Sequence, residues 1–106
     1  MLGRCYKKAV EAVMEDPSLT LCHGVCTGLG GNALGKRYGH AWVEHNNIAR
    51  DVKTDISLSA ELFRFYGQAY PVITYTYDDM MQMVFLHENY GPWHPQIRLA
   101  EHEPQD

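Results

Sequence analysis

The sequence has no long apolar run, little cysteine and no excess of positive charge. Its apolar stretches are only a few residues long, so the chain is not expected to cross a membrane. Its 13 acidic residues outnumber 9 basic ones, giving a formal charge of -4, whereas a nucleic-acid-binding domain normally carries a basic excess. Three cysteines are too few, and odd in number, for a disulfide scaffold, so they favour a reducing, cytoplasmic location.

What the sequence does contain is typical of one folded domain. Its 106 residues fit a single domain spanning 1–106, and 45% hydrophobic with 21% charged residues is ordinary for a globular protein. Charged residues occur throughout the first 15 positions, which predicts that no signal peptide is present.

The first half of the chain reads as a helix followed by three strands. Cys5, Ala9, Val10 and Val13 recur at helical spacing, and Asp16-Pro17 follows as a stop. Two asparagines that tolerate positive φ favour a tight hairpin turn. The expected elements are a helix over Arg4–Glu15, strands over Leu19–Thr27, Tyr38–His45 and Ile48–Thr54, and a turn at Asn46-Asn47.

The second half reads as helix, strand and helix, with a polar tail from about residue 95 that frays. Expected there are a helix over Leu58–Ala69, a strand over Pro71–Tyr77 and a helix that Asp78 or Asp79 caps and that ends near His87. The order predicts an α+β fold in which an N-terminal helix carrying a cysteine packs on a small antiparallel sheet, with further helices in the C-terminal half.

Cys5 is a candidate nucleophile because it lies in the first turn of the first predicted helix. Free backbone N–H groups and the positive end of the helix dipole stabilise a thiolate there. A buried apolar cysteine is the commoner role for such a residue, so the chemistry depends on a base that reaches the sulfur.

His40 and Asp51 are expected to meet across the predicted hairpin. A two-residue loop at Asn46-Asn47 pairs Trp42 with Asp51, which puts Asp51 diagonal to His40 on the same face. The carboxylate would then fix the tautomer of the imidazole and steady its charged form. A three-residue loop would shift the register by one and send Asp51 to the opposite face.

Three motifs resemble the core of transglutaminase-like thiol proteins, which belong to the wider papain-like superfamily. They are Gly3-Arg4-Cys5-Tyr6-x-x-Ala9, Gly39-His40-Ala41-Trp42-Val43-Glu44 and Arg50-Asp51-Val52. In that family a cysteine starts a helix, a histidine lies on a strand, often as His-Ala-Trp-Val-Glu, and an aspartate follows on the next strand. The resemblance covers about the first half of the chain, and its histidine block is the most specific part.

The resemblance implies a cysteine-dependent acyl transfer at an amide or peptide bond: hydrolysis, deamidation or cross-linking. Cys5 would be the nucleophile, His40 the general base and Asp51 the orienting carboxylate, and the backbone N–H of Cys5 would supply one oxyanion donor. No cofactor is implied, and the partner would be a peptide, a protein or a small amide. The alternative is a catalytically inactive binding or inhibitory domain on the same scaffold.

Two departures from the family pattern stand out. Papain-like peptidases usually hold an oxyanion-hole glutamine upstream of the cysteine, and Met1 to Arg4 contain none, so a second donor comes from elsewhere or is missing. The residue after the aspartate is usually proline or a small polar one, and here it is Val52.

Tyr38 and Trp42 share the strand face of His40, which makes them candidate substrate contacts. His23 is a third candidate, because it would line the same cleft as His40 if the first two strands pair.

Other groups suggest weaker alternatives. Cys22-His23-x-x-Cys26 invites a zinc site, but on a strand the two sulfurs lie roughly 13 Å apart, so no metal is expected. The glycine-rich loop Gly28–Gly35 lacks the following helix of a phosphate loop, so a flap or plain connection is favoured. Met80, Met81, Met83 and Phe85 could form a partner surface, although such a stripe is more often core.

Overall fold

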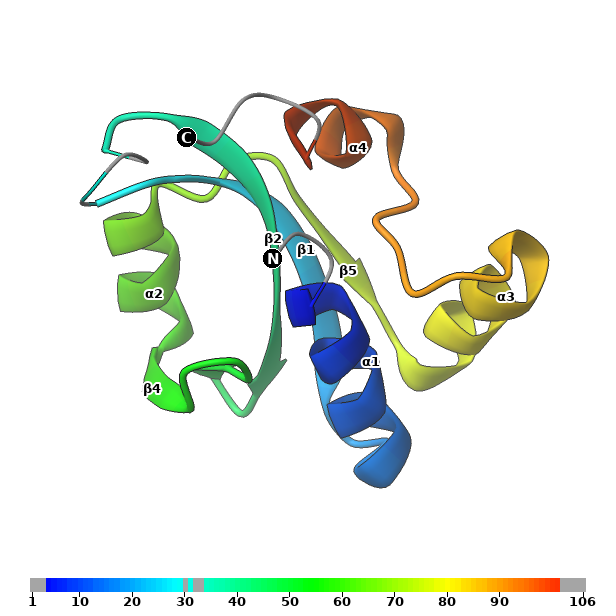
Figure 1. Cartoon of the computed structure of the whole chain (residues 1–106). Helices are drawn as coiled ribbons and strands as arrows, with labels where there is room; N and C mark the ends of the chain where they lie inside the picture. The colour runs from blue at the N-terminus through cyan, green and yellow to red at the C-terminus, as the bar shows by residue number, and fades with distance from the viewer. Residues whose placement is uncertain (1–3, 30, 32–33, 102–106) are drawn as a thin grey trace.

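The chain folds as an antiparallel sheet with helices on both faces (Figure 1). The computed structural model describes residues 4–29, 31 and 34–101. Within them the elements are α1 (Arg4–Glu15), β1 (Thr20–Thr27), β2 (Arg37–His45), β3 (Ile48–Asp51), β4 (Ile56–Ser59), α2 (Ala60–Gly67), β5 (Val72–Tyr75), α3 (Tyr77–His87) and α4 (Pro95–Glu101). The five-stranded sheet has the order β4-β3-β2-β1-β5, and every neighbouring pair is antiparallel. The predicted α+β class, with an N-terminal helix and further helices after the hairpin, is confirmed.

One face of the sheet is covered by α1, α3 and α4, and the other by α2 (Figure 1). The larger core lies on the first face, where Val10 and Val13 of α1 pack with Leu21 of β1 and Val43 of β2. These residues belong to the helical and alternating patterns that the sequence shows. The α1 boundaries predicted from that spacing are confirmed.

The second core lies between the sheet and α2. Here Cys22 and Cys26 of β1 and Trp42 of β2 pack with Phe63 of α2. Side chains alternate between the two faces along each strand, so β1 and β2 contribute to both cores.

The hairpin between β2 and β3 has the predicted two-residue turn. Asn46 and Asn47 have φ values of 49° and 65°, in the left-handed region that asparagine tolerates. His45 pairs with Ile48 and Val43 with Arg50, so the predicted register is confirmed.

The third strand is shorter than expected, and the helix after it starts later. β3 ends at Asp51, where the backbone N–H of Asp55 donates to the Asp51 carbonyl and closes a turn. Ile56–Ser59 then forms β4. No strand is predicted here, because the expected helix begins at Leu58. The Ser59 hydroxyl accepts the Leu62 N–H, so the helix begins at Ala60 rather than at Leu58.

The last part of the chain differs most from expectation. α3 is capped by Thr76, whose hydroxyl accepts the Asp79 N–H, and neither Asp78 nor Asp79 is the cap. The expected fraying tail from about residue 95 is wrong through Glu101, because α4 inserts Ile97 and Ala100 against the sheet. Two apolar residues three apart place one face of this short helix in the core. Residues 102–106 of the expected tail lie outside the described part.

No helix in the described part of the chain is long and apolar enough to cross a membrane.

Candidate active site

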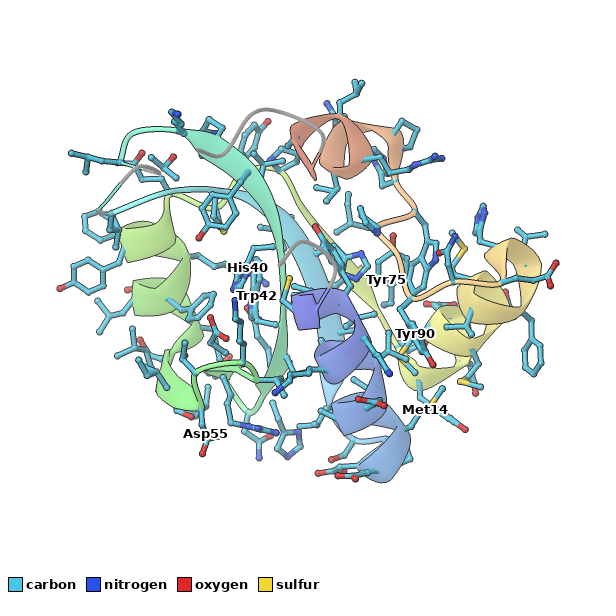
Figure 2. The ribbon with its side chains drawn as sticks, viewed as in Figure 1. Met14, His40, Trp42, Asp55, Tyr75 and Tyr90 are labelled. Carbon is cyan, nitrogen blue, oxygen red and sulfur yellow. The ribbon has the colours of Figure 1, made fainter. Side chains whose placement is uncertain are left out.

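The β2–β3 hairpin brings an imidazole and a carboxylate together. His40 Nε2 lies 2.9 Å from Asp51 Oδ2, and the two side chains are only 14% and 18% exposed. The hairpin register places both residues on the sheet face that α2 covers, as the two-residue turn predicted. Figure 2 shows the His40 side chain on the side of β2 that faces α2.

The Asp51 carboxylate is held by more than His40. Its Oδ1 accepts the backbone N–H groups of Lys53 and Thr54, at 3.0 and 3.2 Å. Burial works to raise the pKa of Asp51, but the hydrogen bond with His40 and these two N–H donors lower it below its usual value. Asp51 is therefore a fixed anion whose two oxygens are both engaged.

The environment of His40 favours its protonated form. Burial of the ring opposes protonation, but side-chain hydrogen bonds with Asp51 and Cys5 outweigh it and raise the pKa of His40 to about 9. Because Asp51 occupies Nε2, the remaining ring nitrogen, Nδ1, is the one available to the Cys5 sulfur.

Cys5 reaches His40 around the edge of the sheet. It is the second residue of α1, and the core that α1 helps to form lies on the opposite face from His40. β3 pairs only with Val43–His45, so within the described residues no strand flanks the other side of the β2 segment that carries His40. α1 packs beside β2. The half-buried thiol of Cys5 can therefore hydrogen-bond a ring that belongs to the other face.

The other two cysteines differ from Cys5 in burial. Cys22 and Cys26 are buried along one face of β1, and burial raises the pKa of each thiol to about 12. Both are free thiols, as is Cys5. Cys22 and Cys26 provide unreactive internal references for any measurement on Cys5.

A pocket of about 320 Å³ opens beside the His40–Asp51 pair. Tyr38 lines it and also contacts the His40 ring edge to face, with ring centroids 5.9 Å apart. Tyr38 therefore lies where the sequence analysis expected a substrate contact. Cys5 is not among the lining residues, so the pocket does not enclose the sulfur.

The prediction that Trp42 contacts a substrate is wrong, because the side chain is buried. Trp42 has no exposed surface, and its indole N–H donates to Glu44 Oε2 at 2.8 Å. Its ring stacks near His40 and packs against Phe63. Trp42 shares the face of His40 as predicted, but it supports the imidazole from inside the core and cannot contact a substrate in this structure.

The expected place of His23 in the same cleft is wrong. β1 and β2 do pair, but the register sets His23 opposite Ala41 and so places it on the α1 face, away from His40. The ring is fully buried between Tyr6, Tyr75 and Trp93. Neither of its nitrogens has a hydrogen-bond partner among the described residues, and burial lowers the pKa of His23 to about 3.

The sequence analysis missed the part of the site that α2 and β4 contribute. Ile56, Leu58, Phe63, Tyr66 and Gly67 all line the pocket. The alternation of Ile56 and Leu58 with two serines is a strand signal that could have been recognised. No local signal shows that α2 folds back over His40, because that contact depends on tertiary packing.

The described residues contain no group of three or more histidine, cysteine or acidic side chains that could hold a metal ion. Cys22 and Cys26 lie on a strand, as the spacing argument against zinc assumed.

Comparisons of this chain with protein-family models, with curated proteins and with solved structures found no match.

Proposed function

We propose that this protein is a cysteine-dependent acyl-transfer enzyme that acts on an amide or peptide bond through Cys5, His40 and Asp51. The observation that carries the proposal is the His40–Asp51 pair, whose Nε2 and Oδ2 atoms lie 2.9 Å apart, with Cys5 among the groups that raise the pKa of His40. The resemblance to transglutaminase-like and papain-like proteins supports the same three residues in the same order along the chain.

The proton that Cys5 and His40 share lies on His40 when the reaction begins, because the environment of the ring favours its protonated form, and Cys5 then attacks as the thiolate. The sulfur attacks the carbonyl carbon of the amide, and the carbonyl electrons move onto oxygen to form a tetrahedral intermediate. The first N–H groups of a helix have no acceptor within it, so the N–H of Cys5 can donate to that oxyanion. His40 then returns the proton to the leaving nitrogen, and a thioester on Cys5 remains.

The second half of the reaction decides the product. His40 accepts a proton from water or from a second amine as that nucleophile attacks the thioester, and the proton returns to the Cys5 sulfur when it leaves. Water gives hydrolysis or deamidation, and an amine gives transamidation. Asp51 stabilises the imidazolium in both halves and, by binding Nε2, leaves Nδ1 available to the sulfur. A reducing, cytoplasmic setting would keep Cys5 available as a thiol.

Alkylation with iodoacetamide tests the proposal without knowledge of the substrate. At pH 7 we expect Cys5 to react fast while the buried Cys22 and Cys26 stay unmodified, as peptide mass spectrometry would measure. An ordinary thiol is only a few per cent ionised at pH 7, so His40→Ala should slow Cys5 labelling about tenfold or more. Asp51→Asn should slow it less, because the imidazole remains.

The control is His45→Ala, which removes an exposed histidine at the far end of β2 and should leave the Cys5 rate unchanged. Circular dichroism of each variant verifies the fold. The enzyme proposal fails if folded His40→Ala labels Cys5 at the wild-type rate.

The second candidate is a catalytically inactive binding domain, and the position of the pocket favours it. The pocket includes His40 and Asp51 in its wall but not Cys5, so a ligand could bind there without contacting the sulfur. Cys5→Ser distinguishes the two candidates. If the protein is an enzyme, the wild type turns over amide substrates and the variant does not. If it is a binding domain, the wild type shows no turnover and the variant keeps the ligand affinity of the wild type.

A further inference from the structure

The pocket beside His40 is built mostly from elements that carry none of the three proposed catalytic residues. Its walls come from the end of β1, from β4 and from α2, in addition to β2 and β3. Its volume of about 320 Å³ lies at the lower end of the range of roughly 300–1,000 Å³ for small-molecule sites. That is room for one ring or one branched side chain with its backbone, and not for a large cofactor.

The walls are mainly carbon. Ile56 and Leu58 project from β4 toward the same face as Asp51 and Ala49, their partners on β3. Phe63 and Tyr66 project from α2, and Tyr38 from β2 closes the side next to His40. Ile56, Leu58 and Tyr66 are 58%, 37% and 53% exposed, so an occupant could cover apolar surface that now faces water.

Among the described residues, no unpaired charge lines this pocket. The charged groups among its lining residues are His40 and Asp51, and they are hydrogen-bonded to each other. The second oxygen of Asp51 is already occupied by two backbone N–H groups. A cationic or anionic group placed here would lose its hydration and find no counter-charge in return, so the pocket disfavours both.

From this geometry we infer that the pocket binds an uncharged aromatic or branched aliphatic group next to the amide on which the enzyme acts. The inference rests on the proposed function, because it treats the occupant as part of a substrate whose carbonyl reaches Cys5. It makes Phe63, Tyr66 and Leu58 specificity-determining residues.

Matched alkylating agents test the inference. N-benzyl-iodoacetamide, N-carboxymethyl-iodoacetamide and iodoacetamide itself share one reaction, in which the Cys5 sulfur forms a bond to carbon and iodide leaves. They differ only in the arm. If the arm enters the pocket, the benzyl reagent should label Cys5 about tenfold faster than iodoacetamide and with saturation, and the carboxymethyl reagent should not be accelerated.

Gly67→Leu is the variant that fills the pocket. A Cβ at Gly67 would meet only the Cys26 sulfur within 4 Å, at 3.7 Å, so the backbone has room for a side chain there. The added side chain should remove the advantage of the benzyl reagent, measured as the ratio of its Cys5 labelling rate to the rate with plain iodoacetamide in the same variant. Leu62→Ala is the matched control, because Leu62 is an exposed α2 residue that does not line the pocket.

The two proposals fail separately. Equal rates for the benzyl and carboxymethyl reagents, or a benzyl advantage that survives Gly67→Leu in a folded protein, would overturn the pocket assignment and leave the enzyme proposal standing. If His40→Ala leaves the rate of Cys5 labelling by plain iodoacetamide unchanged, the enzyme proposal is overturned. Phe63→Ala provides a second variant if Gly67→Leu does not fold, and it should reduce the benzyl advantage by enlarging the pocket.

Discussion

His40 retains its proton because its two hydrogen-bonding neighbours outweigh the cost of burying its ring. The same hydrogen bond lowers the pKa of Asp51, because it stabilises the carboxylate anion. At the scale of single residues, the pair therefore links the chemistry of the site to the stability of the fold, since each charge is more favourable in the folded than in the unfolded chain.

The raised pKa of His40 predicts how stability depends on alkaline pH. The folded value of about 9 exceeds the unfolded value of about 6.5, so the extra stability is fully present below pH 6.5 and is lost as pH rises through 9. The loss should approach about 3 kcal/mol, since one pKa unit corresponds to 1.36 kcal/mol. Urea unfolding of wild type and His40→Gln between pH 6 and 9.5 measures it, and the decline should be absent in the variant.

At the scale of elements, α2 is tied to β2 by one carboxylate. Glu44 Oε1 and Oε2 accept from the guanidinium of Arg64 at 2.9 and 3.0 Å, and Oε2 also accepts the Trp42 indole N–H. These contacts position the helix that carries Phe63 and Tyr66 over the pocket. The glutamate of the His-Ala-Trp-Val-Glu motif thus has a structural role of its own.

Glu44→Ala should destabilise the protein more than Arg64→Ala. Loss of Glu44 leaves the buried Trp42 N–H without its acceptor, which costs about 1–3 kcal/mol. Loss of Arg64, which is 38% exposed, removes one donor from Glu44, but the carboxylate keeps the Trp42 N–H, so the loss of stability should be smaller. Denaturant unfolding of both variants gives the comparison, and an equal or reversed order would contradict it.

At the scale of the whole molecule, the α1 face of the sheet closes over His23. Trp93 and Tyr75 pack against its ring, and Gly91 approaches so closely that a Cβ there would lie 2.8 Å from His23 Cε1. The segment before α4 therefore covers a histidine that must stay neutral for the core to remain closed.

Acid should destabilise the whole fold through His23. Its folded pKa of about 3 lies below the unfolded value of about 6.5, so the unfolded chain binds the proton first and stability falls as pH drops below 6.5. The loss between pH 6.5 and 4.5 should reach about 2 kcal/mol. His23→Leu should abolish this decline in thermal or urea unfolding, while the exposed control His87→Leu should retain it. An unchanged decline in folded His23→Leu would refute the assignment.

Local pattern was enough to predict α1, the β2–β3 hairpin and the meeting of His40 with Asp51, because each depends on residues close in sequence. It was not enough for α4, which packs Ile97 and Ala100 against the sheet, whereas the alternation in β4 was a local signal that the prediction overlooked. The same limit explains the misplacement of His23, since its β2 partner, Ala41, is 18 residues away and a shift of one position changes the face.

The sequence by itself determined the elements whose periodicity is strong and the turn whose asparagines set the hairpin register. Only the tertiary structure decided that Cys5, on a helix of one face, reaches a histidine of the other, and that α2 and β4 build a carbon-lined pocket beside it. The physical reason is that periodicity is a property of neighbouring residues. Contacts between distant segments depend on which apolar faces bury one another, and many arrangements share the same local pattern.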